Sequence, residues 1–135
     1  MDTIVITVVT GRRPGVHDLT LEVRAYLRGR GDGLLNVFVP HATAGLAIIE
    51  TGAGSDHDLL DRLEHLVPHD DPLYRHRHGA PGHGADHVVP AFLAPTLCVP
   101  VLDGVPALGV WQSIVLVDTN ADNPDRQVRL SFLAG

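Results

Sequence analysis

The arrangement of apolar and polar positions along the chain predicts short strands interrupted by helices. Runs rich in β-branched and other apolar residues, which favour strands, lie at 3–9, 34–39, 44–49, 96–102, 109–117 and 126–133. Apolar residues recur at helical spacing over roughly 19–28 and about 56–67. Asp86 can cap a shorter helix over 87–94. Strands and helices do not alternate regularly, so the pattern indicates one α+β domain over residues 1–135.

The last two predicted strands, 109–117 and 126–133, are expected to form an antiparallel pair across the polar loop at 118–125. The first of them is apolar on both faces, and such a strand needs cover on both sides. A lone subunit would therefore expose an apolar patch or an unpaired strand edge. Closed symmetric association would remove that exposure, which predicts a homo-oligomer with part of 108–118 or its neighbours at the interface.

Composition narrows the functional classes. The 135-residue chain has a net charge of −6 and no lysine, which excludes lysine Schiff-base and P-loop chemistry and argues against broad nucleic-acid binding. No apolar run approaches the ~20 residues of a membrane helix, and the N-terminus lacks the charge order of a signal peptide, so we expect a cytoplasmic protein. Cys98 is expected to be a buried small hydrophobe, and a strand tryptophan such as Trp111 usually belongs to a core.

Histidines are concentrated in one predicted connection. Five of the nine lie between 69 and 87, in and beside an irregular stretch at 68–86 that is long for a loop in a small domain. His76 and His78 form a His-x-His pair, a weak metal-binding motif. His83 and His87 are four residues apart and would share a helix face.

Two interpretations of these histidines remain open. Gly82 and Gly84 argue against a helix around His83, and any one loop histidine can simply be solvated. For the cluster as a whole, a metal site or a proton-transfer site is favoured, because neutral imidazole is a common metal ligand and the usual base near pH 7. A ligand set drawn from distant parts of the chain cannot be found from spacing alone.

Four stretches, read together, resemble the YjbQ family, also called UPF0047 or the secondary thiamine-phosphate synthase family. HATAGLAIIE at 41–50 resembles the family's His-Thr-Thr/Ser-Ala-(Gly/Ser)-Leu-x-(Ile/Leu)-Asn-Glu, and YRH at 74–76 resembles its Tyr-x-His. DHVVPAFLAPTLCVPVLDG at 86–104 resembles its His-(Ile/Leu)-Lys segment with the Pro-Val and Gly-Arg that follow. ALGVWQSIVLVD at 107–118 resembles its Leu-Gly-Thr-Trp-Gln-Gly-Ile.

The resemblance implies a compact, mostly antiparallel α+β domain with two or three helices that assembles as a homotrimer. It also implies a histidine-lined pocket near the subunit contacts that is a suspected metal site. His78 and His83 have no clear counterpart in the family and rank lower as ligands. By role, the candidates are His41, His76 and His87 for a metal, Glu50, His41 and Gln112 for catalysis, and Arg75 and Trp111 for ligand binding.

The chain departs from the family pattern at two basic positions, which are Val89 and Val105 here. This loss would weaken phosphate binding unless Arg75, Arg77 or Arg126 takes over. The first hypothesis is a metal-dependent enzyme, with zinc as the best-suited ion, that hydrolyses or transfers a small phosphorylated or heteroaromatic molecule, weak thiamine-phosphate synthase activity included. The alternative is a non-catalytic trimer that binds a small ligand or metal.

Overall fold

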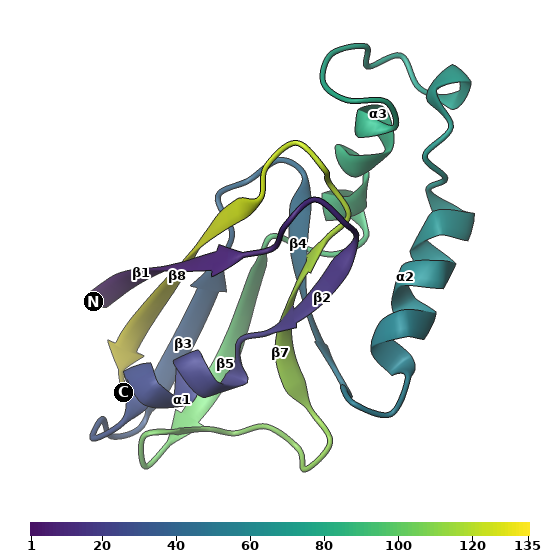
Figure 1. Ribbon diagram of the computed structural model, residues 1–135. Coiled ribbons are helices and arrows are strands. Elements are labelled where there is room, and N and C mark those ends of the chain that lie inside the picture. The colour runs from purple at the N-terminus through teal and green to yellow at the C-terminus, as the bar shows by residue number, and fades with distance from the viewer.

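A computed structural model describes residues 1–135 as two antiparallel sheets and three α-helices. The strands are β1 (Asp2–Val9), β2 (Gly15–Asp18), β3 (Gly33–Phe38), β4 (Ala44–Ile49), β5 (Thr96–Leu102), β6 (Val105–Pro106), β7 (Ser113–Asp118) and β8 (Asp125–Ala134). The helices are α1 (Thr20–Leu27), α2 (Ser55–Leu66) and α3 (His83–Asp86), with 3₁₀ turns η1 (Asp71–Leu73) and η2 (Val89–Ala91). The larger sheet has the order β1-β8-β3-β5-β6 and the smaller one β2-β7-β4 (Figure 1).

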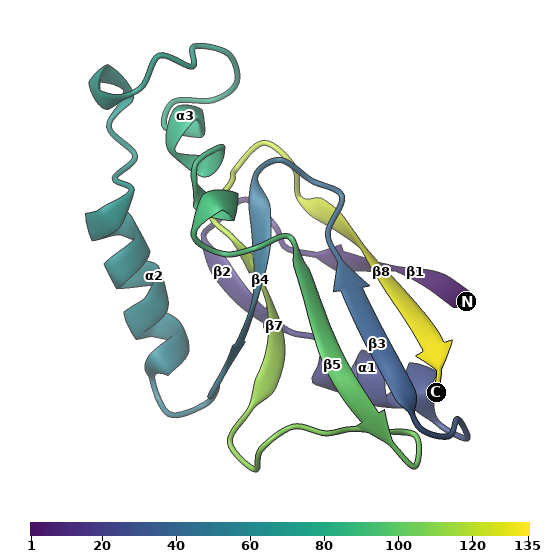
Figure 2. The same ribbon diagram turned by 180° about the vertical axis from the view of Figure 1, so that it is seen from behind.

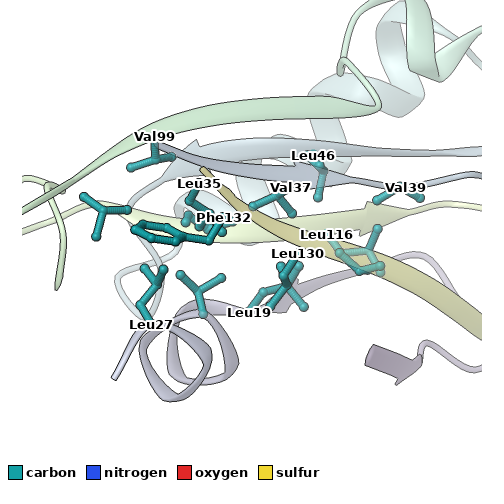
Figure 3. Packing of buried hydrophobic residues seen from close by; sticks show 14 of the residues in the cluster. Leu19, Leu27, Leu35, Val37, Val39, Leu46, Val99, Leu116, Leu130 and Phe132 are labelled. Atoms are coloured by element: carbon teal, nitrogen blue, oxygen red, sulfur yellow. The ribbon is translucent and has the colours of Figure 1, made fainter. Parts of the chain in front are cut away.

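The main core lies between the inner face of the larger sheet, the smaller sheet and α1 (Figure 3). Period-two alternation produces this inner face, because Val128 and Leu130 of β8 are fully buried while Gln127 and Arg129, which alternate with them, are exposed. The register pairs Leu35 of β3 with Phe132 of β8, and Figure 3 shows Leu27 of α1 beneath them. Each such fully buried side chain contributes about 1.5–3 kcal/mol, so the two sheets and α1 form one packed unit.

The smaller sheet is covered on both faces within one chain. Ile114 and Leu116 of β7 point into the main core, whereas Val115 and Val117 pack against Leu63 of α2. Figure 2 shows α2 lying along the outer side of this sheet, away from the larger one. The prediction that this apolar strand would need a neighbouring subunit for cover is therefore wrong for β7, whereas Val110 and Trp111 before it are exposed.

Three further predictions about the C-terminal half are wrong. The last two long strands do not pair with each other, because β7 belongs to the smaller sheet and β8 pairs with β1 and β3. Residues 109–112 form a turn rather than strand, which leaves Trp111 74% exposed outside the core. Cys98 is exposed on the outer face of β5 rather than buried.

The predicted helix over 87–94 is replaced by two shorter pieces. The one-turn helix α3 ends at Asp86, and the 3₁₀ turn η2 follows, so Asp86 does not cap a helix that starts after it. The four-residue strand β2 was not predicted, since four residues carry too little pattern. The α+β class and the antiparallel sheets are confirmed. No helix has both the length and the apolar character that crossing a membrane requires.

Candidate functional site

The strand register separates the predicted site residues into two groups within one chain. β4 pairs with β7 so that Ala44 lies opposite Asp118 and Ile49 lies opposite Ser113. The chain enters β4 just after His41 and leaves it at Glu50. At ~3.3 Å per strand residue, the two ends of β4 are about 17 Å apart. Trp111 and Gln112 directly precede β7 and so share the end of the sheet with Glu50, away from His41.

Three histidines converge at the other end of the molecule. One ring nitrogen from each of His76, His83 and His87 lies within 4.8 Å of the others. The ring centroids are 4.1 Å apart for His76 and His87, 4.6 Å for His83 and His87, and 5.2 Å for His76 and His83. The structure thus brings together two of the three predicted ligands, His76 and His87, and adds His83, which ranked lower by sequence.

α3 and the loop before it position these rings. His83 is the first residue of α3 and His87 directly follows its last, so one helical turn presents both rings on the same side. Gly82 starts this turn with φ 86°, a left-handed conformation that glycine adopts at little cost. Gly79 also has positive φ, and a Cβ added there would lie 2.6 Å from Cγ of His83 and 2.8 Å from Oδ2 of Asp122. The two glycines therefore shape the loop that holds His83.

Asp122 and Asn120 both contact Nδ1 of His83. Oδ2 of Asp122 lies 2.6 Å from this nitrogen and Nδ2 of Asn120 lies 2.9 Å from it. A carboxylate can only accept, so the Asp122 contact favours a proton on Nδ1 and a lone pair on Nε2, which lies 2.8 Å from Nε2 of His87. A carboxylate that holds the far nitrogen of an imidazole is the usual second-sphere partner of a metal-bound histidine.

The chemistry of the three imidazoles fits a divalent metal. Burial, followed by the neighbouring histidines, lowers the pKa of both His76 and His87, which favours the neutral form that binds metals. Nδ1 of His76 is buried and has no hydrogen-bond partner. A buried polar atom without a partner is costly, and a metal ion that bonds to this nitrogen would remove that cost. Three neutral imidazoles also form the usual protein ligand set of an open catalytic zinc site.

A series of hydrogen-bonded charged groups contacts α3 at Asp86. His69 lies between two carboxylates, with Nδ1 2.5 Å from Oε2 of Glu64 and Nε2 2.7 Å from Oδ1 of Asp86. Asp86 is 2% exposed and also accepts hydrogen bonds from Thr119 (2.7 Å) and Asn120 (2.9 Å). Burial raises the pKa of Asp86, but its hydrogen bonds from His69, Thr119 and Asn120 outweigh this effect and hold the pKa below its usual range. The buried carboxylate next to His87 is therefore ionised and held in place.

His69 is the positively charged member of this series of groups. The hydrogen bond to Asp86 has the largest effect on the pKa of His69 and raises it. Burial lowers the pKa, and the hydrogen bond to Glu64 raises it further, so the pKa of His69 reaches about 9. The side chain is about one quarter exposed. His69 is thus an imidazolium at neutral pH and cannot serve as a metal ligand there, because both ring nitrogens carry protons.

His41 lies in an open hollow of about 440 Å³ that His83, His87 and Arg126 also line. Nε2 of His41 accepts a hydrogen bond from the Gln127 backbone N–H (2.9 Å), so Nδ1 carries the proton when the ring is neutral. Burial and then the Arg126 charge lower the pKa of His41. The structure therefore places His41 in the same hollow as His83 and His87 but outside the group of three imidazoles.

Arg126 is buried, yet it also reaches this hollow. Its Nε and Nη2 bind Asp118 at 2.7 and 3.0 Å, and Nη2 also donates to Thr43. None of these bonds uses Nη1. A guanidinium fixed by a buried carboxylate can present its remaining donors to an oxyanion in the hollow.

The remaining basic candidates do not line this hollow. Arg75 is exposed, and Arg77 donates to the backbone carbonyl of Asp71. Val89, where the family pattern has lysine, is fully buried, and Val105 is exposed in β6. Of the three arginines considered as substitutes for the lost bases, Arg126 is the one beside the histidines.

Sequence reasoning ranked His83 too low and missed the roles of three residues around it. Two glycines argued against a helix near His83, although its spacing to His87 was the right signal. Asp122 and Asn120 are far from the three histidines in sequence, and His69, although it belongs to the same histidine-rich stretch, is part of no recognised motif. Their roles depend on side-chain contacts that only the folded chain creates.

The chain is similar to known proteins both in sequence and in fold. The model of the family described as UPF0047 protein YjbQ-like matches residues 4–135. A UPF0047 protein of Mycobacterium tuberculosis is 65% identical over 135 residues, which is 100% of both chains, and one of Archaeoglobus fulgidus is 32% identical, covering 91% of this chain and 95% of its own. The crystal structure of a hypothetical protein from Aeropyrum pernix K1 has a TM-score of 0.88 at 32% identity and covers 100% of both chains. A conserved hypothetical protein of Thermus thermophilus has a TM-score of 0.85 at 30% identity, covering 96% of this chain and 99% of its own. The chain belongs to the UPF0047 YjbQ-like family.

Proposed function

We propose that this protein is a metal-dependent enzyme that acts on a small phosphorylated molecule, with His76, His83 and His87 as the ligands of a divalent ion. The observation that supports the proposal best is the convergence of their ring nitrogens within 4.8 Å. Zinc suits an all-imidazole site, and nickel and iron accept the same donors. The ion would supply Lewis acidity toward an oxygen of the substrate. The Nδ1–H of His83 held by Asp122 orients one ligand toward the ion.

The substrate class follows from the donors in the hollow. The guanidinium of Arg126 and the Nδ1–H of His41 both belong to residues that line it, and both suit the oxygens of a phosphate. A hollow of about 440 Å³ has room for a small molecule rather than a polymer. Arg126 would replace the two family bases that are Val89 and Val105 here. Thiamine-phosphate synthase activity would use substrates of this class, small phosphorylated molecules.

The proposed metal centre is tested by measuring metal content and affinity in protein purified without a histidine tag. Wild-type protein should bind about one Zn²⁺ per chain with at least micromolar affinity in chelator competition. His83→Ala should weaken binding by at least about 10-fold, since it removes a ligand and the Asp122 contact. His41→Ala should retain the metal, because His41 lies outside the group. Loss of metal with His41→Ala and not with His83→Ala would reject this ligand set.

We further propose that the protein is a homotrimer in which Glu50, Trp111 and Gln112 of one subunit approach the histidine hollow of another. This would give the metal centre a carboxylate for proton transfer, which Glu50 cannot supply within its own chain. If no such trimer forms, Glu50 stays far from the histidines of its own chain, which favours the alternative of a non-catalytic binding protein. Turnover of a panel of small phosphorylated compounds separates the two. An enzyme loses turnover with Glu50→Gln and keeps its metal, whereas a binding protein shows none in the wild type.

A further inference from the structure

A second cavity, of about 300 Å³, lies beneath α2. It has no lining residue in common with the histidine hollow. Its apolar lining comes from Leu60 and Leu63 on one side of α2, from Val67, which directly follows the helix, and from Val89 of η2. Leu60 and Leu63 are three residues apart on one helix face, so with Val67 at the helix end they form a continuous apolar wall. A cavity of this volume with a mainly apolar wall is the usual setting of a small-ligand site.

The polar side chains around this cavity offer hydrogen-bond acceptors but no free donor. Asp61, Glu64, His69 and Thr119 also line the cavity. Both ring N–H groups of His69 already donate, one to Glu64 and one to Asp86. The Thr119 hydroxyl donates its only proton to Asp86 as well. The carboxylates of Asp61 and Glu64 still have lone pairs, so a ligand must bring the donors itself.

The negative charge around the cavity also favours a ligand that brings its own hydrogen-bond donors. Asp61 and Glu64 lie three residues apart on one face of α2, and the single charge of His69⁺ is shared between Glu64 and Asp86. An anionic ligand would meet uncompensated carboxylates, whereas a cation would neutralise them. His69 and Thr119 are fixed by their bonds to Asp86, so the polar end of the cavity is already ordered before a ligand binds.

We propose that the cavity beneath α2 binds a small organic ammonium ion, with its apolar body against Leu60, Leu63 and Val67 and its N–H donors on Asp61 and Glu64. The site is independent of any metal at the histidine centre. A neutral molecule of the same shape would use only the apolar wall, and an organic anion would be rejected.

The experiment uses full-length protein in excess chelator, so that the proposed metal centre plays no part. Phenethylammonium is titrated while methyl resonances are followed by NMR, with phenethyl alcohol and 3-phenylpropanoate as the neutral and anionic controls. Methyl signals of Leu63, Val67 and Val89 should shift with the ammonium. Its affinity should exceed that of the alcohol by about two- to five-fold, as expected for a partly exposed ion pair.

Two isosteric variants on the same helix complete the test. Asp61→Asn should reduce the affinity for phenethylammonium to that for the alcohol and leave the alcohol unaffected. Asp58→Asn, one turn earlier and outside the cavity, should change neither. Shifts confined to the histidine hollow, equal binding of the anion, or no binding at millimolar probe would each overturn the proposal. None of these outcomes bears on metal binding by His76, His83 and His87.

Discussion

At the scale of single residues, the arrangement of His69 between Glu64 and Asp86 makes stability depend on pH. The pKa of His69 is raised to about 9 in the folded protein, against 6.5 for the free side chain. A raised pKa contributes stability that is fully present below pH 6.5 and is lost as pH rises through 9. We expect His69→Gln to lower the free energy of unfolding by about 2 kcal/mol between pH 5.5 and 6.5, because buried Asp86 loses its cation. The difference from wild type should shrink steadily toward pH 9 and above.

Denaturant unfolding at several pH values measures this effect. His65→Gln is the matched control, since His65 is exposed and contacts only the backbone carbonyl of Asp61. Its effect should stay within about 0.5 kcal/mol, as for other surface substitutions. A His69→Gln penalty that is the same at pH 6 and pH 9 would contradict the assignment of His69 as the cation.

At the residue scale, the sequence points to side chains that the structure brings together where a local pattern is present, and it misses those that only long-range contacts bring in. His76 and His87 were identified from the histidine cluster and from motif resemblance, and both belong to the group that the structure assembles. His83 ranked lower because helix propensity counted against its glycine neighbours. Here tertiary packing overrides propensity: Gly82 takes a positive φ, and a single turn is enough to align His83 with His87.

At the scale of elements, the loop before α3 depends on Gly79. Gly79→Ala would place a Cβ at φ 87° against His83 and Asp122, which must then separate. We expect a loss of about 1–2 kcal/mol in stability from the backbone conformation. We also expect a drop of about 10-fold or more in Zn²⁺ affinity from disruption of the His83–Asp122 contact. Chemical unfolding and chelator competition measure the two effects separately.

Gly52→Ala provides the control for backbone strain. Gly52 has φ 84°, and nothing lies within 4 Å of a Cβ added there. This variant should lose similar stability and keep its Zn²⁺ affinity. Equal loss of affinity in both variants would show that general destabilisation, rather than the His83–Asp122 contact, controls Zn²⁺ binding at the proposed site.

Most elements were predictable because they carry a strong period. β1, β3, β4, β5, α1 and α2 fall within one or two residues of their predicted bounds. Sheet assignment was not predictable, because β7 and β8 are neighbours in sequence yet separate between the two sheets. The polar loop between them, with Asn120 and Asp122, crosses from one sheet to the other and carries the groups that hold His83 and Asp86. The topology thus creates the support of the site, and no local pattern encodes it.

At the scale of the whole molecule, the surfaces left uncovered differ from those that the apolar pattern suggested. Both faces of β7 are buried within one chain, so this strand cannot drive assembly. The exposed apolar side chains lie elsewhere, with Leu34, Leu102 and Leu133 on the outer face of the larger sheet and Val110 and Trp111 on the turn before β7. A trimer that covers these groups could also bring Glu50 and Gln112 of one subunit to the histidines of another.

This shared site gives a prediction that one chain alone cannot satisfy. Light scattering should report about three times the chain mass of 14.5 kDa. A nitroxide is attached at position 112 of chains without ¹⁵N, through Gln112→Cys with Cys98→Ser. These spin-labelled chains are then mixed with chains that carry no nitroxide and whose histidines carry ¹⁵N. Broadening of the His41, His83 and His87 ring signals can then come only from a neighbouring subunit. We expect this broadening in refolded mixtures and not in mixtures of separately assembled oligomers. A clean monomer, or a trimer without broadening, would leave the histidine centre to work with the groups of a single chain, and Glu50 would have no part in it.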